Sequence, residues 1–250
     1  MLRNPIACML AALFVLGAAV SLAEDAGMPM PMSNYWFGVL RRGPSWTPER
    51  NARTDSIQAG HMANIGRMAA SGSLLSAGPF MSRGDWRGIF IFRADSVEKL
   101  RAMAAKDPAL ESGRLVLDLY SWFAPAGIGE PYKRLAQQPG HRDSMHTMQL
   151  VMLKRGPRWT GKATPGLLKL QREHTAAIFD GLLAGRFAIA GPFGTDSPDS
   201  NYSGVIVMRG DSTLARTQAN ADPMVKAGRL AVEILPWLTA WGAMPGDTLK

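Results

Sequence analysis

The chain has 250 residues, a formal net charge of +8 at pH 7 and a single cysteine, Cys8. One cysteine excludes an intrachain disulfide framework and a cysteine-based zinc site. The basic residues are scattered among acidic ones, without a stripe of interleaved aromatic residues. This pattern argues against nucleic-acid binding and leaves attraction to an acidic ligand open.

The first residues have the pattern of a secretory signal. Arg3 precedes an apolar stretch from Ile6 to Leu22, and Ser21-Leu22-Ala23 is a small-x-small cleavage pattern. We therefore expect residues 1–23 to be removed and the mature chain to be periplasmic or secreted. The apolar stretch is short for a membrane anchor, so no stable span is expected after cleavage.

The rest of the chain contains a tandem sequence repeat. The passage Leu40-Arg41-Arg42-Gly43-Pro44-Ser45-Trp46-Thr47 recurs as Leu153-Lys154-Arg155-Gly156-Pro157-Arg158-Trp159-Thr160. Further on, Asp107-Pro108 recurs as Asp222-Pro223. Such a repeat indicates two similar units. We predict domains over residues 33–125 and 145–243, with a linker rich in glycine and proline over 126–144.

Each copy predicts the order strand, helix, strand, strand, helix, strand. In the first copy, apolar runs predict strands over 35–40, 74–80, 88–92 and 115–120. One helix ends near Gly72, and another begins at Asp95-Ser96 and ends before Pro108. This order predicts an antiparallel sheet with both helices on one face, a ferredoxin-like α+β unit.

A lone ferredoxin-like unit leaves its second sheet face bare. We therefore expect the two units to pack sheet to sheet, as an intrachain pseudo-dimeric α+β barrel. Further homo-oligomerisation of whole chains is left open.

One histidine of each copy lies on the apolar face of the first predicted helix. His61 is in line with Ile57 and Ile65, and His174 has the equivalent place. The topology brings the loop with Asp107, or Asp222 in the second copy, to the same end of the unit. An imidazole titrates near pH ~6.5, and a carboxylate on one nitrogen fixes its tautomer, so such a pair can act as a general base. The alternative is a hydrogen-bonded core histidine and an aspartate that caps a turn.

The turns at the same end supply candidate ligand-binding residues. Arginine can bind a carboxylate, tryptophan can line a pocket, and glycine lets a ligand approach the backbone. The alternatives are a solvated arginine, a tryptophan that covers the core edge, and simple turn geometry. The candidates are Arg42, Trp46, Gly78, Pro79, Arg155, Trp159, Gly191 and Pro192.

Together these residues resemble the YCII-related domain family, of the dimeric α+β barrel type. The resemblance is carried by His61, Gly72-x-Leu74-x-x-Ala77-Gly78-Pro79, Asp107-Pro108 and Gly113-Arg114-Leu115, each with a counterpart in the second copy. It implies a histidine–aspartate active site, which maps onto His61 with Asp107 and His174 with Asp222. The Arg-Gly-Pro-x-Trp turn and the secretory signal depart from the family pattern.

Three functions follow as hypotheses. The first is an enzyme without cofactor or metal that moves a proton on a small molecule, as an isomerase or lyase does. The second is a non-catalytic module that binds a small ligand. The third is copper handling by Met28-Pro29-Met30-Pro31-Met32, because thioethers prefer Cu(I). The enzyme needs its histidines, the binding module tolerates their isosteric loss, and copper handling needs the methionine tract.

Overall fold

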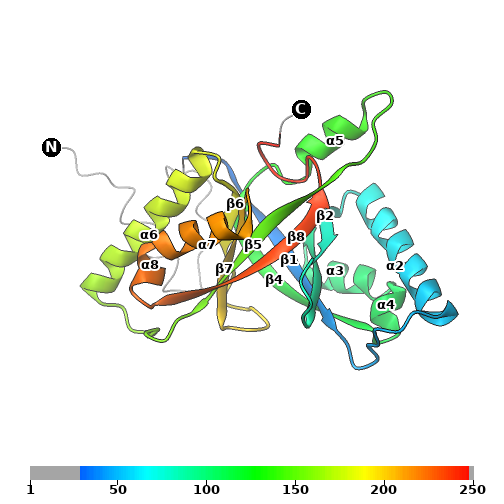
Figure 1. Ribbon diagram of the computed structural model, residues 1–250, viewed down its shortest axis with the longest axis horizontal. Coiled ribbons are helices and arrows are strands. Elements are labelled where there is room, and N and C mark those ends of the chain that lie inside the picture. The colour runs from blue at the N-terminus through cyan, green and yellow to red at the C-terminus, as the bar shows by residue number, and fades with distance from the viewer. Residues whose placement is uncertain (1–28, 248–250) are drawn as a thin grey trace. The chain divides into compact units, whose positions relative to one another are not determined.

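The computed structural model describes residues 29–247 (Figure 1). The predicted signal segment and Met28 lie outside these residues. The chain divides into two compact units. The first-copy unit consists of Asn34–Trp122, Gly127–Thr147 and the segment from Leu235 onward. The second-copy unit consists of Met148–Ile234, Phe123–Ala126 and the residues before Asn34.

The first copy has the predicted ferredoxin-like order. Its sheet runs β2-β3-β1-β4, and β3 pairs antiparallel with both β1 and β2. The expected strands and long helices, and their order along the chain, are therefore confirmed. The elements are β1 (Met32–Arg42), α2 (Ala52–Ala70), β2 (Leu74–Pro79), β3 (Trp86–Phe92), α3 (Val97–Ala104), α4 (Pro108–Glu111) and β4 (Leu115–Pro125).

The second copy repeats this architecture. Its sheet runs β6-β7-β5-β8, and even the irregularity in strand register recurs, between Leu40 and Arg41 and again between Leu153 and Lys154. The elements are β5 (Met145–Arg155), α6 (Pro165–Leu183), β6 (Phe187–Pro192), β7 (Tyr202–Met208), α7 (Ser212–Ala221), α8 (Pro223–Lys226) and β8 (Leu230–Ala240).

Short helices are the main difference from the sequence prediction. The predicted linker contains α5 (Glu130–Ala136), and α4 and α8 stand between the second long helix and the last strand of each copy. Asp107 and Asp222 are the N-caps of α4 and α8, each followed by proline at the first helical position. Proline suits that position, because its fixed φ matches the helix and it has no N–H to leave unpaired. The prolines that end one predicted helix therefore begin another.

Local sequence fixes the ends of the helix that carries each histidine. Asn51 caps α2 in a reciprocal capping box with Thr54, with N–O distances of 3.0 and 2.9 Å. Gly72 follows the end of α2 with a φ of +74°, which glycine adopts without steric cost. In the second copy, Leu167 N donates to the Thr164 hydroxyl at 3.1 Å and so caps α6.

Close backbone approach explains why the Arg-Gly-Pro-x-Trp turn keeps its glycine. A Cβ atom added to Gly43 would lie 2.2 Å from the carbonyl oxygen of Gly113. In the second copy, a Cβ atom on Gly156 would lie 2.4 Å from Gly228 O. The turn therefore packs directly on the backbone that leads into the last strand of each sheet.

The helices of each copy pack on one face of its sheet. In the first copy, Met68, Leu100 and Ala109 from the helices join Leu40 and Phe90 from the strands in one buried cluster. The second copy has an equivalent cluster.

The second cluster is packed differently, because Gly181 stands in the place of Met68. The ring of Phe187 fills that space, and a Cβ atom on Gly181 would lie 2.2 Å from it.

Within residues 29–247, no helix combines the length and apolar character needed to cross a membrane.

Strand β2 is covered along its free edge by the end of β8, inside the first-copy unit. Met81 N donates to Pro236 O at 2.8 Å, and Phe80 forms an antiparallel bridge with Trp237. The Ser76 and Thr239 hydroxyls lie 3.2 Å apart. The edge of this sheet is thus paired by a segment that comes late in the sequence.

Candidate functional site

In the first copy, a histidine and an aspartate meet in the core. His61 Nδ1, on α2, lies 3.0 and 2.8 Å from the two carboxylate oxygens of Asp107. Asp107 also accepts hydrogen bonds from Asn64 Nδ2 at 3.2 Å and from Ala109 N at 2.9 Å. The aspartate is fully buried, and its carboxylate lies within hydrogen-bond distance of three protein donors.

The second copy forms the same pair. His174 Nδ1, on α6, lies 2.6 Å from Asp222 Oδ2. The other oxygen of Asp222 accepts from Met224 N at 2.8 Å and Val225 N at 3.3 Å. Both copies thus bring together the residues that the sequence pairs. The capping alternative also holds, because each aspartate caps a helix and holds a histidine at once.

The pairing fixes the chemistry of the imidazole. In a neutral histidine that donates Nδ1–H to a carboxylate, Nε2 carries the lone pair and can accept a proton. The side chains of His61 and His174 keep 9% and 8% of their surface accessible. Burial raises the pKa of Asp107, but the hydrogen bonds from His61, Ala109 and Asn64 outweigh it and leave that pKa below its ordinary value.

The surroundings of the two pairs differ. Asn64, which binds Asp107, is replaced by Ala177 in the second copy, so the second carboxylate lacks this donor. Phe90, whose ring stacks on His61 with centroids 6.0 Å apart, is replaced by Ile206. Leu100 is likewise replaced by Ala215. At these three positions the first copy has the larger residue, and two of them, Asn64 and Phe90, contact the His61–Asp107 pair.

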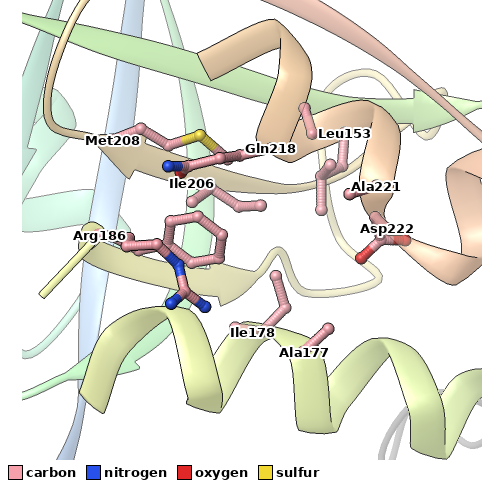
Figure 2. A pocket seen from close by; sticks show the side chains of 11 residues that line it. Leu153, Ala177, Ile178, Arg186, Ile206, Met208, Gln218, Ala221 and Asp222 are labelled. Carbon is pink, nitrogen blue, oxygen red and sulfur yellow. The ribbon is translucent and has the colours of Figure 1, made fainter. Parts of the chain in front are cut away.

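A cavity of about 150 Å³ lies beside the second pair (Figure 2). Asp222 lies at one end of its lining and Arg186 at the opposite end. His174 is not among the lining residues, but it precedes Ala177, which is, by one turn of α6. The lining is mainly apolar and consists of Leu153, Ala177, Ile178, Arg186, Phe187, Ile206, Met208, Gln218, Ala219, Ala221 and Asp222.

Gln218 gives the cavity an unsatisfied acceptor. Its Oε1 is buried and has no hydrogen-bond partner within the part of the chain that the structure describes. A buried acceptor without a donor costs about 1–3 kcal/mol. A ligand hydroxyl or N–H group would remove this cost.

The remaining candidate residues lie apart from these contacts. Arg42 and Trp46 pack on each other, with the guanidinium carbon 5.3 Å from the ring centroid, and Arg155 and Trp159 do the same at 5.3 Å. The backbone of Gly78 lies against Leu238, whose carbonyl oxygen would be 1.8 Å from an added Cβ atom.

This contact explains the glycine at position 78 by strand packing. Pro79 ends β2, and Gly191 and Pro192 end β6. For these four turn and strand-end residues, ligand binding stays a prediction.

The sequence reasoning missed Asn64, Arg186 and Gln218. A comparison of the two copies on the inward faces of α2 and α6 would have found Asn64, because alanine replaces it at the matching position. Arg186 matches Ser73 and Gln218 matches Met103, and neither replacement indicates that the two residues line one cavity.

Metal-ligating side chains do not gather in the described structure. Within residues 29–247, no group of three or more His, Cys, Asp or Glu residues could hold a metal ion. Of the methionine tract, Met30 lies in a bend and Met32 begins β1. Copper handling stays a prediction.

Compared with family models and with curated proteins, the chain shows no match. Solved structures do resemble it. A mutant chlorite dismutase from Candidatus Nitrospira defluvii, in complex with cyanide, is 11% identical with a TM-score of 0.51, over 82% of this chain and 90% of that one. Another mutant of the same enzyme is 15% identical with a TM-score of 0.51 and the same coverage. A heme-binding protein from Thermus thermophilus is 14% identical, over 85% of this chain and 94% of that one, with a TM-score of 0.46.

At these identities the likeness concerns the fold alone. It agrees with the two four-stranded antiparallel sheets and their helices. The chain has the chlorite dismutase-like, dimeric α+β barrel fold, with two ferredoxin-like units in tandem.

Proposed function

We propose that this protein is an enzyme that moves a proton on a small molecule without a cofactor, and that His174 with Asp222 is the working pair. The observation that carries this proposal is the cavity beside Asp222, next to a histidine that is already oriented through Nδ1. His61 and Asp107 form the equivalent pair, but Asn64 and Phe90 close around it. We assign that pair to stability.

The proposed chemistry is general-base catalysis followed by return of the proton. Nε2 of neutral His174 takes a proton from the substrate, and the carboxylate of Asp222 stabilises the imidazolium that forms. The imidazolium then gives the proton back at a second atom of the substrate. The step conserves atoms and electrons, so it needs no oxidant and no metal. The outcome is an isomerisation, or an elimination if a leaving group departs instead.

The lining of the cavity defines the substrate class. An apolar cavity of roughly 150 Å³ holds a molecule the size of benzene. The guanidinium of Arg186 lies opposite Asp222, where it can bind a carboxylate. Gln218 Oε1 can accept a hydrogen bond from a ligand. We therefore infer a short acid of about six non-hydrogen atoms, with a C–H bond that an adjacent carbonyl group makes acidic.

Deuterium exchange tests the proposal without knowledge of the natural substrate. Short 2-oxo acids such as pyruvate and 2-oxobutanoate fit the inferred class, and loss of their C3 protons in D2O is followed by proton NMR. We expect the protein to accelerate this exchange. His174→Gln should abolish the acceleration, whereas His61→Gln should retain it if the variant remains folded, as judged by circular dichroism.

Two results would contradict the assignment. Equal loss of exchange in both histidine variants, with both folded, would refute the distinction between the two pairs. Binding of the acids without any exchange, unchanged in His174→Gln, would establish the alternative, a non-catalytic module for a small ligand. That alternative shares the cavity and differs only in the need for the imidazole.

A cofactor is not part of this proposal. Haem does not fit the cavity beside Asp222, because about 150 Å³ is well below the ~300 Å³ at the lower end of ordinary ligand sites. Membership of the YCII-related family and export to the periplasm or beyond remain proposals that rest on the sequence pattern. N-terminal sequencing of the mature protein tests the second, with Glu24 as the expected first residue.

A further inference from the structure

Three arginines surround one tryptophan at the end of the first-copy sheet. The guanidinium carbons of Arg42, Arg87 and Arg114 lie 5.3, 4.9 and 4.7 Å from the ring centroid of Trp46. Arg42 ends β1, Arg87 lies in β3, and Arg114 directly precedes β4. Three neighbouring strands thus direct positive charge to one place.

The backbone holds this cluster in place. Gly43 N donates to Arg114 O, and Ser45 N donates to Gly113 O, both at 2.9 Å. The turn that carries Trp46 is therefore tied to the strand entry that carries Arg114. The cluster is preorganised before any ligand arrives, which reduces the ordering cost of binding.

The three charges have no acidic partner within residues 29–247, where no ion pair includes any of these guanidiniums. Asp118 and Asp85, two acidic residues from the same part of the chain, both pair with Arg41 instead. Burial lowers the pKa of Arg87, and the charge of Arg42 lowers it further. The guanidiniums therefore repel one another, and an anion would relieve that repulsion.

The second copy shows that the fold does not need this charge. Arg155 alone packs on Trp159, at 5.3 Å. Ser203 takes the place of Arg87. Arg87 precedes Gly88, which pairs with Leu40, and Ser203 precedes Gly204, which pairs with Leu153. Arg229, which matches Arg114, instead donates to the backbone oxygens of Arg158 and Thr160. One arginine on the ring suffices for the turn.

We propose that Arg42, Arg87, Arg114 and Trp46 form a binding site for a small phosphate-type oxyanion. Guanidinium groups bind phosphate oxygens through paired N–H donors, and three of them match a doubly charged phosphate better than a single carboxylate. Trp46 holds the arginine planes through its ring. The site is separate from the proposed catalytic pair, so either can exist without the other.

Inorganic phosphate is the probe for this site. Its binding to the full chain is measured by broadening of the phosphorus-31 NMR signal, with sodium chloride used to keep the ionic strength constant. We expect binding to wild type, and affinity at least tenfold weaker in Arg114→Gln and in Arg42→Gln. Arg42 is exposed at a strand end, so its variant should fold even if Arg114→Gln does not. Arg155→Gln is the matched control and should bind phosphate as wild type does.

Two outcomes would overturn the site. The first is phosphate broadening no greater than that seen with an equal concentration of a protein lacking such a cluster, at the same ionic strength. The second is equal weakening by Arg155→Gln and Arg42→Gln, which would indicate attraction to the overall positive charge. Glycerol 3-phosphate, titrated in parallel, distinguishes a preference for free phosphate from a preference for a small phosphate ester.

Discussion

Replacement of each aspartate by alanine should affect the two copies unequally. Asp107→Ala removes the acceptor for three buried donors, from His61, Asn64 and Ala109. Each buried donor left without an acceptor costs about 1–3 kcal/mol, so we expect a loss of roughly 3–5 kcal/mol from the three together. Asp222→Ala also strands donors, but the cavity beside it has room for water to replace the lost acceptor. We expect this second loss to be about 1–2 kcal/mol.

Thermal and urea unfolding of the full chain measure this difference. A gap of roughly 2 kcal/mol corresponds to about 4–8 °C in melting temperature for a chain of this size. Amide hydrogen exchange at Ala109 and Met224 localises the effect, because these N–H groups lose their acceptors. If Asp222→Ala destabilises the protein as much as Asp107→Ala, the inference that the first pair is closed and the second is open is wrong.

Three further predictions concern pH and packing. Hydrogen bonds hold the pKa of Asp107 below its ordinary value. Its contribution to the free energy of unfolding is therefore present above the unfolded pKa of about 3.9 and is lost as pH falls through the folded value. In urea titrations below pH ~4, the stability difference between wild type and Asp107→Asn should shrink. Burial and, second, the nearby Glu233 raise the pKa of Tyr202. Its contribution to the free energy of unfolding is therefore complete below the unfolded pKa of about 10 and is lost as pH rises. Tyr202→Phe should make stability fall less steeply with alkaline pH, and an unchanged slope would refute this. Gly43→Ala should lower the free energy of unfolding by about 1–3 kcal/mol, since its Cβ atom would collide with Gly113 O. The control, Gly66→Ala on α2, meets nothing within 4 Å. It should raise the free energy of unfolding by about 0.5–1 kcal/mol, measured by thermal unfolding.

Most of the fold could be predicted from the sequence because the repeat doubles each local signal. Strand runs and helix ends such as Gly72 depend on short-range chemistry, and both copies agree on them. The pairing of His61 with Asp107 was also predictable, since topology brings the helix and the loop before the last strand together. The short helices α4 and α8 were missed, because a proline such as Pro108 or Pro223 is equally compatible with the end of one helix and the first residue of the next.

The differences between the two sites were not predictable in the same way. The cavity depends on the combined volumes of side chains from several elements, among them Ala177, Ile206 and Phe187. No single substitution indicates whether neighbours fill the space that it leaves. The arginine cluster likewise depends on strand register, which places Arg87 beside Trp46 although the two residues lie far apart in the sequence.

The covering of β2 by the end of β8 means that the repeat in the sequence is not the unit of folding. A fragment cut at the predicted linker would carry a complete first copy and still lack Pro236, Trp237 and Thr239. Its β2 edge would expose unpaired backbone groups, which invite pairing with other chains. Circular permutation is the gentler operation, since it moves the chain ends and keeps every residue. Residues 236–239 thus complete the edge of a sheet whose other strands lie more than a hundred residues earlier in the sequence.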